Sequence, residues 1–119
     1  MLDAKFFISD EIEEKTVELA DGSKEVLFFK HLPNTDFERY AIWTGSRDED
    51  VQANAAARLL VLGLCEPDGR PAVTLEQAIR IKRPVMLRMF RALMEVNAYG
   101  TEKPGNGLPP AVKSGSGTS

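Results

Sequence analysis

Residues 84–99 restrict the fold of this chain more than any other stretch. Placed on a helix, Pro84–Tyr99 has only a narrow polar stripe, which consists of Arg88, Arg91 and Glu95. The rest of its circumference is apolar. Such a helix either lies at the centre of its own domain or presents to a partner the face that its own core does not use. The sequence alone leaves both interpretations open.

Methionines are concentrated in this predicted helix. Met86, Met89 and Met94 fall within nine residues, and flexible thioethers suit surfaces that adapt to varied partners. Helical geometry distributes these side chains over two faces, of which one must pack in the core. We predict that the other face binds a partner. The residues predicted to form the partner-binding surface are Met86, Met89, Phe90, Leu93 and Met94.

A β-hairpin is predicted near the start of the chain. Glu14–Leu19 alternates between apolar and polar residues, and Glu25–Leu32 is rich in strand-forming side chains. Asp21 and Gly22 lie between them and are a strong turn signal, because glycine tolerates positive φ. Lys5–Ile8 is a further strand candidate.

Three helical segments are predicted between the hairpin and the last helix. Thr35 and Glu38 have capping-box spacing and would begin a short helix that ends at Gly45. A second helix is expected over Asp48–Leu64, where apolar residues recur at helical spacing behind a capping aspartate. A second capping box, Thr74–Gln77, would begin the third.

These elements predict one α+β domain over residues 1–100, with a small N-terminal β-hairpin packed on a bundle of about four helices. Gly100 would end the last helix. Residues 101–119 contain four of the nine glycines and three of the seven prolines. This composition cannot bury enough apolar surface to offset the entropy of ordering, so we predict a flexible Gly/Pro/Ser-rich tail.

Composition argues against an enzyme. The chain has one histidine, His31, and one cysteine, Cys65, so a thiolate metal cage or a multi-histidine site cannot form within it. No nucleotide-binding, hydrolase or metalloprotease motif is present. The acidic residues Glu11, Glu13 and Glu14 lack calcium-loop spacing and are expected to be solvated. We therefore expect no catalytic residue, no cofactor and no metal.

The charges are unevenly distributed along a chain of net charge −3. Residues 1–25 contain eight acids and three lysines, a balance of −5, whereas Arg80–Arg91 is basic. Head-to-tail self-association would exploit this asymmetry, although two solvated faces are the more common explanation of such a charge distribution. An acidic chain with no aromatic residue interleaved within Arg80–Arg88 is not expected to bind nucleic acid. The longest apolar run, Leu59–Cys65, is far shorter than the ~20 residues that span a bilayer, so no membrane association is expected.

The order of these elements resembles that of the tail assembly chaperones of long-tailed, siphovirus-type bacteriophages. The resemblance covers roughly residues 4–100 and depends on order and spacing. The segments that contribute to it are Leu19–Gly22, Val26–Leu32, Thr35–Trp43, Asp48–Leu64, Cys65–Gly69, Thr74–Ala78 and Pro84–Gly100.

The resemblance implies a non-structural late protein that binds the tape measure protein, keeps it soluble and helps tail tube subunits to gather around it. It also implies a location in the host cytoplasm and absence from the mature virion. In many members a programmed frameshift yields a longer form, through which the tail tube protein would be recruited. The alternative is a structural tail connector or completion protein that is retained in the virion.

Overall fold

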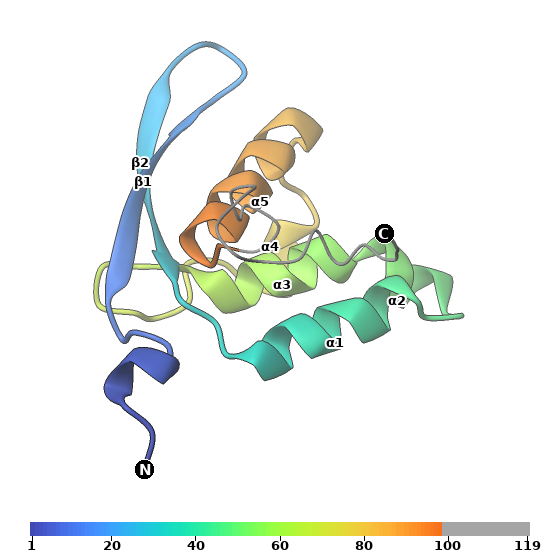
Figure 1. Cartoon of the computed structure of the whole chain (residues 1–119). Coiled ribbons are helices and arrows are strands. Elements are labelled where there is room, and N and C mark those ends of the chain that lie inside the picture. Colours follow the sequence, from blue (N-terminus) through green and yellow to red (C-terminus); the bar gives the residue numbers. More distant parts are fainter. Residues whose placement is uncertain (99–119) are drawn as a thin grey trace, which may run out of the picture.

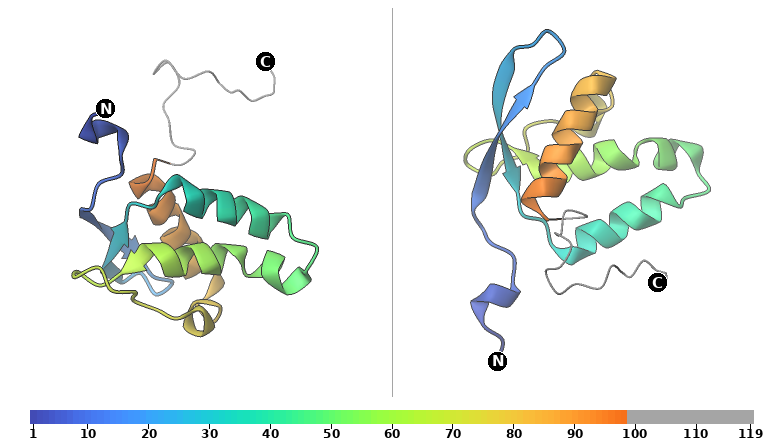
Figure 2. Two further views of the ribbon diagram at one scale, coloured as in Figure 1. Left: turned by 90° about the horizontal axis from the view of Figure 1, so that it is seen from below. Right: turned by 45° about the horizontal axis from the view of Figure 1, so that its top comes forward.

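The computed structural model describes residues 1–98 and confirms an α+β fold (Figure 1). A three-stranded antiparallel sheet has the order β1-β2-β3. Helix α5 lies against the β1–β2 hairpin, and α3 and α1 lie beside each other below it, as Figure 2 also shows. The elements are η1 (Ala4–Phe6), β1 (Ile12–Glu18), β2 (Lys24–Lys30), α1 (Asn34–Thr44), α2 (Glu49–Ala53), α3 (Ala55–Gly63), β3 (Leu64–Cys65), α4 (Leu75–Ala78) and α5 (Arg83–Val96). The predicted tail, residues 101–119, lies outside the described residues.

The predicted hairpin is confirmed, with shifted ends. Strand β1 begins at Ile12, which pairs with Lys30 of β2, and the ladder closes where Glu18 pairs with Lys24. Gly22 has a φ of 89°, the positive value that the turn requires, and its N–H donates to the Leu19 carbonyl at 3.0 Å. The local turn signal was therefore sufficient to place the reversal.

The strand candidate over Lys5–Ile8 is wrong. Within residues 1–98 this stretch has no strand beside it, and Ala4–Phe6 forms one turn of 3₁₀ helix instead. The Phe6 and Phe7 N–H groups donate to the Asp3 and Ala4 carbonyls, each at 3.0 Å. A strand without a neighbour cannot satisfy its backbone groups, whereas a local turn satisfies some of them.

Helix α1 confirms the stop at Gly45 but not the capping box at its start. The helix begins at Asn34, directly after Pro33, whose carbonyl accepts the Asp36 N–H at 2.9 Å. Thr35 therefore lies inside the first turn, where its hydroxyl is not the cap. The predicted box at Thr74–Gln77 does form, because the Thr74 hydroxyl accepts the Gln77 N–H at 3.1 Å and the reciprocal bond is present.

The single helix predicted over Asp48–Leu64 is instead two helices, α2 and α3. Asp48 caps the first as expected, since its Oδ1 accepts the Asp50 N–H at 2.9 Å. The break falls at Asn54, with φ −98° and ψ 9°, where a residue of low helix propensity leaves α-helical geometry. Leu64 belongs to the short strand β3, which was not predicted and pairs with Phe28 and Phe29 of β2.

The core lies where the hairpin, α3 and α5 meet. The largest fully buried side chains are Phe29, Leu59, Leu60 and Leu93, from β2, α3 and α5. Helix α5 begins at Arg83 with Pro84 in its first turn, as expected, but ends at Val96, earlier than predicted. Gly100 lies outside the described residues. None of the helices within residues 1–98 combines the length and apolar character needed to cross a bilayer.

Asn97 explains the early end of α5 and joins the helix to the sheet. Its side-chain oxygen accepts the Leu32 N–H at 2.7 Å, and its amide nitrogen donates to the Lys30 and Leu93 carbonyls at 3.2 and 3.0 Å. Replacing Asn97 with Ala would leave the half-buried groups around it without partners. We expect Asn97→Ala to lower the free energy of unfolding by about 1–2 kcal/mol, measured by urea titration. A change below about 0.5 kcal/mol would show that water replaces these bonds without cost.

Candidate functional site

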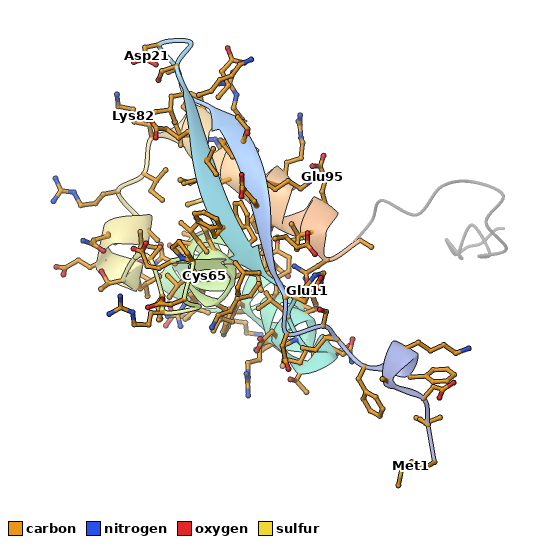
Figure 3. The ribbon with its side chains drawn as sticks, turned by 90° about the vertical axis from the view of Figure 1, so that its left-hand side faces the viewer. Met1, Glu11, Asp21, Cys65, Lys82 and Glu95 are labelled. Atoms are coloured by element: carbon orange, nitrogen blue, oxygen red, sulfur yellow. The ribbon has the colours of Figure 1, made fainter. Side chains whose placement is uncertain are left out.

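An open apolar cleft lies between the hairpin turn and the first half of α5. Its volume is about 580 Å³. The hairpin contributes one wall, and α5 with the preceding connection contributes the other, as the positions of Asp21 and Lys82 in Figure 3 show. We call it the hairpin cleft. Its lining residues are Leu19, Ala20, Asp21, Ile81, Lys82, Val85 and Met89.

Polar contacts from two side chains, Arg88 and Lys15, hold the hairpin against α5. The Arg88 guanidinium donates from Nη1 to the Glu18 carbonyl at 2.7 Å and to the Leu19 carbonyl at 3.3 Å. Further along α5, Lys15 Nζ lies 3.4 Å from Glu95 Oε1. Charged donors satisfy the carbonyls at the end of β1, so the turn is held over the helix instead of standing free.

The hairpin cleft has one charge of each sign among its lining residues. The Ser23 hydroxyl and N–H both donate to Asp21 Oδ1, at 2.6 and 2.9 Å, and these hydrogen bonds hold the pKa of Asp21 below its ordinary value. Asp21 is therefore ionised at neutral pH, opposite the Lys82 ammonium. The remaining lining side chains are apolar, so the chemistry of the cleft favours binding of an apolar group over catalysis.

A second, smaller cleft lies on the other side of Ile81. Its volume is about 230 Å³, and it separates α2 and the start of α3 from the α4–α5 connection. Met86 lines this cleft, whereas Met89 lines the hairpin cleft, and Ile81 contributes to both. The two methionines therefore point into different hollows of the surface.

The five residues predicted to bind a partner divide into two groups. Met86, Met89 and Phe90 are half-buried and pack on the edge of the core. Leu93 is completely buried and Met94 is only 9% exposed, so both belong to the core itself. In this folded state Leu93 and Met94 have almost no surface to offer a partner.

Phe90 has a structural contact of its own. Its ring centroid lies 5.6 Å from that of Tyr40 on α1, with the rings tilted by 45°. This geometry is favourable for an aromatic pair and fixes α5 against α1. Of the five predicted residues, Met86 and Met89 line the two clefts described here.

Sequence reasoning missed the contribution of the hairpin turn to this site. Leu19 is predicted as the end of a strand, and neither Ala20 nor Ile81 is among the residues predicted to bind a partner. The cleft that joins them depends on the packing angle between the hairpin and α5, for which no sequence signal exists. Arg88, which holds the two together, was expected to lie on a solvated helix face.

The contacts between the N-terminal region and α5 do not neutralise the charge asymmetry noted in the sequence. The acidic region contributes a lysine, Lys15, to the ion pair with Glu95, and Arg88 donates to the Glu18 backbone carbonyl and not to its carboxylate. These two contacts therefore leave the complementarity that suggested self-association unsatisfied. Self-association remains a proposal.

The single histidine and the single cysteine are the other residues considered for chemistry in the sequence. His31 Nε2 lies 3.0 Å from Glu13 Oε2 across the hairpin. Cys65 is buried, and burial raises the pKa of its thiol, which disfavours the reactive thiolate. Across the part of the chain that the structure describes, no group of three or more His, Cys, Asp or Glu side chains is placed to hold a metal ion.

Comparison with known proteins shows similarity in structure but not in sequence. No protein-family profile matches the chain, and no curated protein matches it in sequence. The solved structure of the bacteriophage HK97 tail assembly chaperone aligns with a TM-score of 0.48 and 20% sequence identity. The alignment covers 71% of this chain and 80% of that one.

Proposed function

We propose that the chain is a bacteriophage tail assembly chaperone that binds apolar segments of a tape measure protein and keeps them soluble. Two observations support the proposal. The first is the order and spacing of sequence elements over residues 4–100. The second, which carries the argument, is the hairpin cleft, an open apolar hollow with a methionine in its wall.

The cleft suits a client whose sequence varies from site to site. A coating factor must bind many segments of one long chain, so it needs contact surfaces that adapt more than they discriminate. Met89 is unbranched and half-buried, and its thioether can adjust to side chains of different shape. The volume lies within the range of about 300–1,000 Å³ typical of small-ligand sites, which accommodates a few client side chains.

The two charges of the cleft would orient the client. Asp21 and Lys82 can each form an ion pair or hydrogen bond with a polar residue that flanks an apolar segment. An amphipathic helix offers this pattern, with apolar residues on one face and charges at its border.

The wider role in morphogenesis is part of the same proposal. Once the tape measure protein is coated, tail tube subunits would gather around it, recruited through a longer frameshifted form. The chaperone would act in the host cytoplasm and leave before the virion is complete. The competing function, a tail connector or completion protein, predicts the chain in purified mature particles, where mass spectrometry would detect it.

Substitution of Met89 tests the cleft directly. We expect Met89→Gln to reduce the amount of soluble tape measure protein recovered on co-expression by at least half, since the amide weakens the apolar wall. Stability should fall by only about 1 kcal/mol, because Met89 is half-buried and glutamine has similar length and helix propensity.

Ile42→Gln is the matched control. Ile42 is 69% exposed on α1 and does not line the hairpin cleft, so this variant removes exposed apolar surface elsewhere. It should leave tape measure solubility at the wild-type level. If Met89→Gln also leaves solubility unchanged while remaining folded, the hairpin cleft is not the client site.

A further inference from the structure

The N-terminal segment, Met1–Ile8, is an exposed apolar stretch. Phe6 and Phe7 are 64% and 63% exposed, and Leu2 and Ile8 also have more than half of their surface in solvent. The segment projects from the base of the hairpin, away from the helices, as the position of Met1 in Figure 3 shows. Two adjacent exposed aromatic rings at the end of a projection form the kind of surface that a partner covers.

The hairpin cleft of the same copy lies at the opposite end of the hairpin from these rings. Phe6 and Phe7 precede the start of β1, whereas the cleft begins at Leu19, directly after the end of β1 and about 23 Å from Ile12 at the usual rise per strand residue. The segment would have to fold back along the whole of β1 to reach it. Figure 3 places Met1 and Glu11 at one end of the molecule and Asp21 and Lys82 at the other.

The charges on the two surfaces are complementary. Asp3, Asp10 and Glu11 flank the apolar residues of the segment, with Lys5 as the one basic residue among them. The connection between α4 and α5 at the edge of the hairpin cleft is basic. Asp21 is the one acidic residue that lines the cleft, and no acidic side chain of residues 1–98 forms an ion pair with the cations there. These cations are Arg80 and Lys82 in the connection and Arg83, the first residue of α5.

We propose that the N-terminal segment of one copy occupies the hairpin cleft of a second copy. Phe6 and Phe7 would pack against Leu19, Val85 and Met89, and the flanking acids would face the cations of the α4–α5 connection. The inference uses the cleft of the proposed function but needs no client, so either can fail without the other.

The contact is head-to-tail and therefore open-ended. Each copy that joins offers a free segment at one end and a free cleft at the other, so growth does not stop at a dimer. Eight residues in one cleft bury less than the ~1,200 Å² of a standard stable interface, so association should be weak and depend on concentration. Client and segment would also compete for the cleft, which lets a client displace a neighbouring copy.

Two variants each remove one side of the proposed contact, either the N-terminal segment or the hairpin cleft. Phe6→Ser/Phe7→Ser removes the aromatic rings and leaves the cleft intact. Met89→Glu places a carboxylate in the apolar wall, where it would repel the acidic segment, and leaves the segment intact. Met86→Glu is the matched control, because Met86 is also half-buried on α5 but lines the second cleft.

Sedimentation velocity of the full chain over a series of concentrations measures its self-association. We expect the wild type and Met86→Glu to form species larger than a dimer, and each of the two defective variants to remain monomeric alone. An equimolar mixture of the two defective variants should form a dimer and no larger species, because only one functional segment and one functional cleft can meet.

Three outcomes would overturn the inference: a wild type that is monomeric at every concentration, defective variants that associate like the wild type, or a mixture that forms no dimer. If Met89→Glu has a much lower melting temperature than the wild type, Leu19→Glu is used in place of Met89→Glu, because it introduces the same charge from the hairpin wall. Tape measure solubility is measured separately with Met89→Gln, so a failed mixture would leave the proposed function standing.

Discussion

Replacing Leu93 with Ala should lower the free energy of unfolding by about 3–5 kcal/mol, the largest effect expected from a single substitution in α5. Leu93 is fully buried and packs in one cluster with Leu59 and Leu60 of α3. Truncation removes these contacts and leaves a cavity that the surrounding helices and sheet can fill only in part. For a domain of ordinary stability, about 5–15 kcal/mol, the loss is a large fraction of the total. Urea unfolding followed by circular dichroism measures it.

Leu87→Ala is the control for that experiment. Leu87 lies on the same helix but is 51% exposed, so its truncation should change stability by no more than about 0.5 kcal/mol. The contrast would show that α5 has one core face and one open face. Equal losses at the two positions would instead mean that α5 is buried on all sides, and that no face of it is free for a client.

A second large effect is expected at Gly63, the last residue of α3. A Cβ at this position would collide with Leu93 Cδ1 and lie 3.1 Å from Cδ2. Leu93 is completely buried, so its side chain has little room to shift. We expect Gly63→Ala to cost about 2–3 kcal/mol by overpacking, despite the better helix propensity of alanine. Thermal and urea unfolding both report this loss.

The clash also predicts coupling between the two positions. In the Leu93→Ala background the colliding methyl groups are gone, so Gly63→Ala should cost at least about 1 kcal/mol less than it does alone. Strict additivity of the two substitutions would show that the loss at Gly63 arises within α3 itself and not from the contact with α5.

Local signals in the sequence were sufficient for much of the fold. Asp21 and Gly22 placed the hairpin turn, Thr74 and Gln77 placed the start of α4, and Gly45 placed the end of α1. Each of these signals depends on a backbone conformation or a cap that neighbouring residues create by themselves. It can therefore be predicted without knowledge of distant contacts. The α+β class followed from these elements and from the change of hydrophobic period between them.

Partners distant in sequence decided the elements that were missed. Strand β3 has only two residues, too few to show any periodicity. It forms because its backbone pairs with Phe28 and Phe29 of β2. The Lys5–Ile8 stretch has strand-forming residues but no neighbouring strand, so it is not a strand. Asn97 ends α5 by bonding to Leu32 and Lys30, more than sixty residues away.

Some features of the candidate site were also determined by the sequence, and others only by the tertiary structure. The sequence by itself determined that the helix after Pro84 is too apolar to be an ordinary surface helix, and that its methionines are candidates for binding. Only the tertiary structure decided which of them are accessible: Leu93 and Met94 pack in the core, whereas Met86 and Met89 line open clefts. The physical reason is that helical periodicity specifies which side chains share a face, but the packing of α5 on the hairpin and α3 specifies which face is covered.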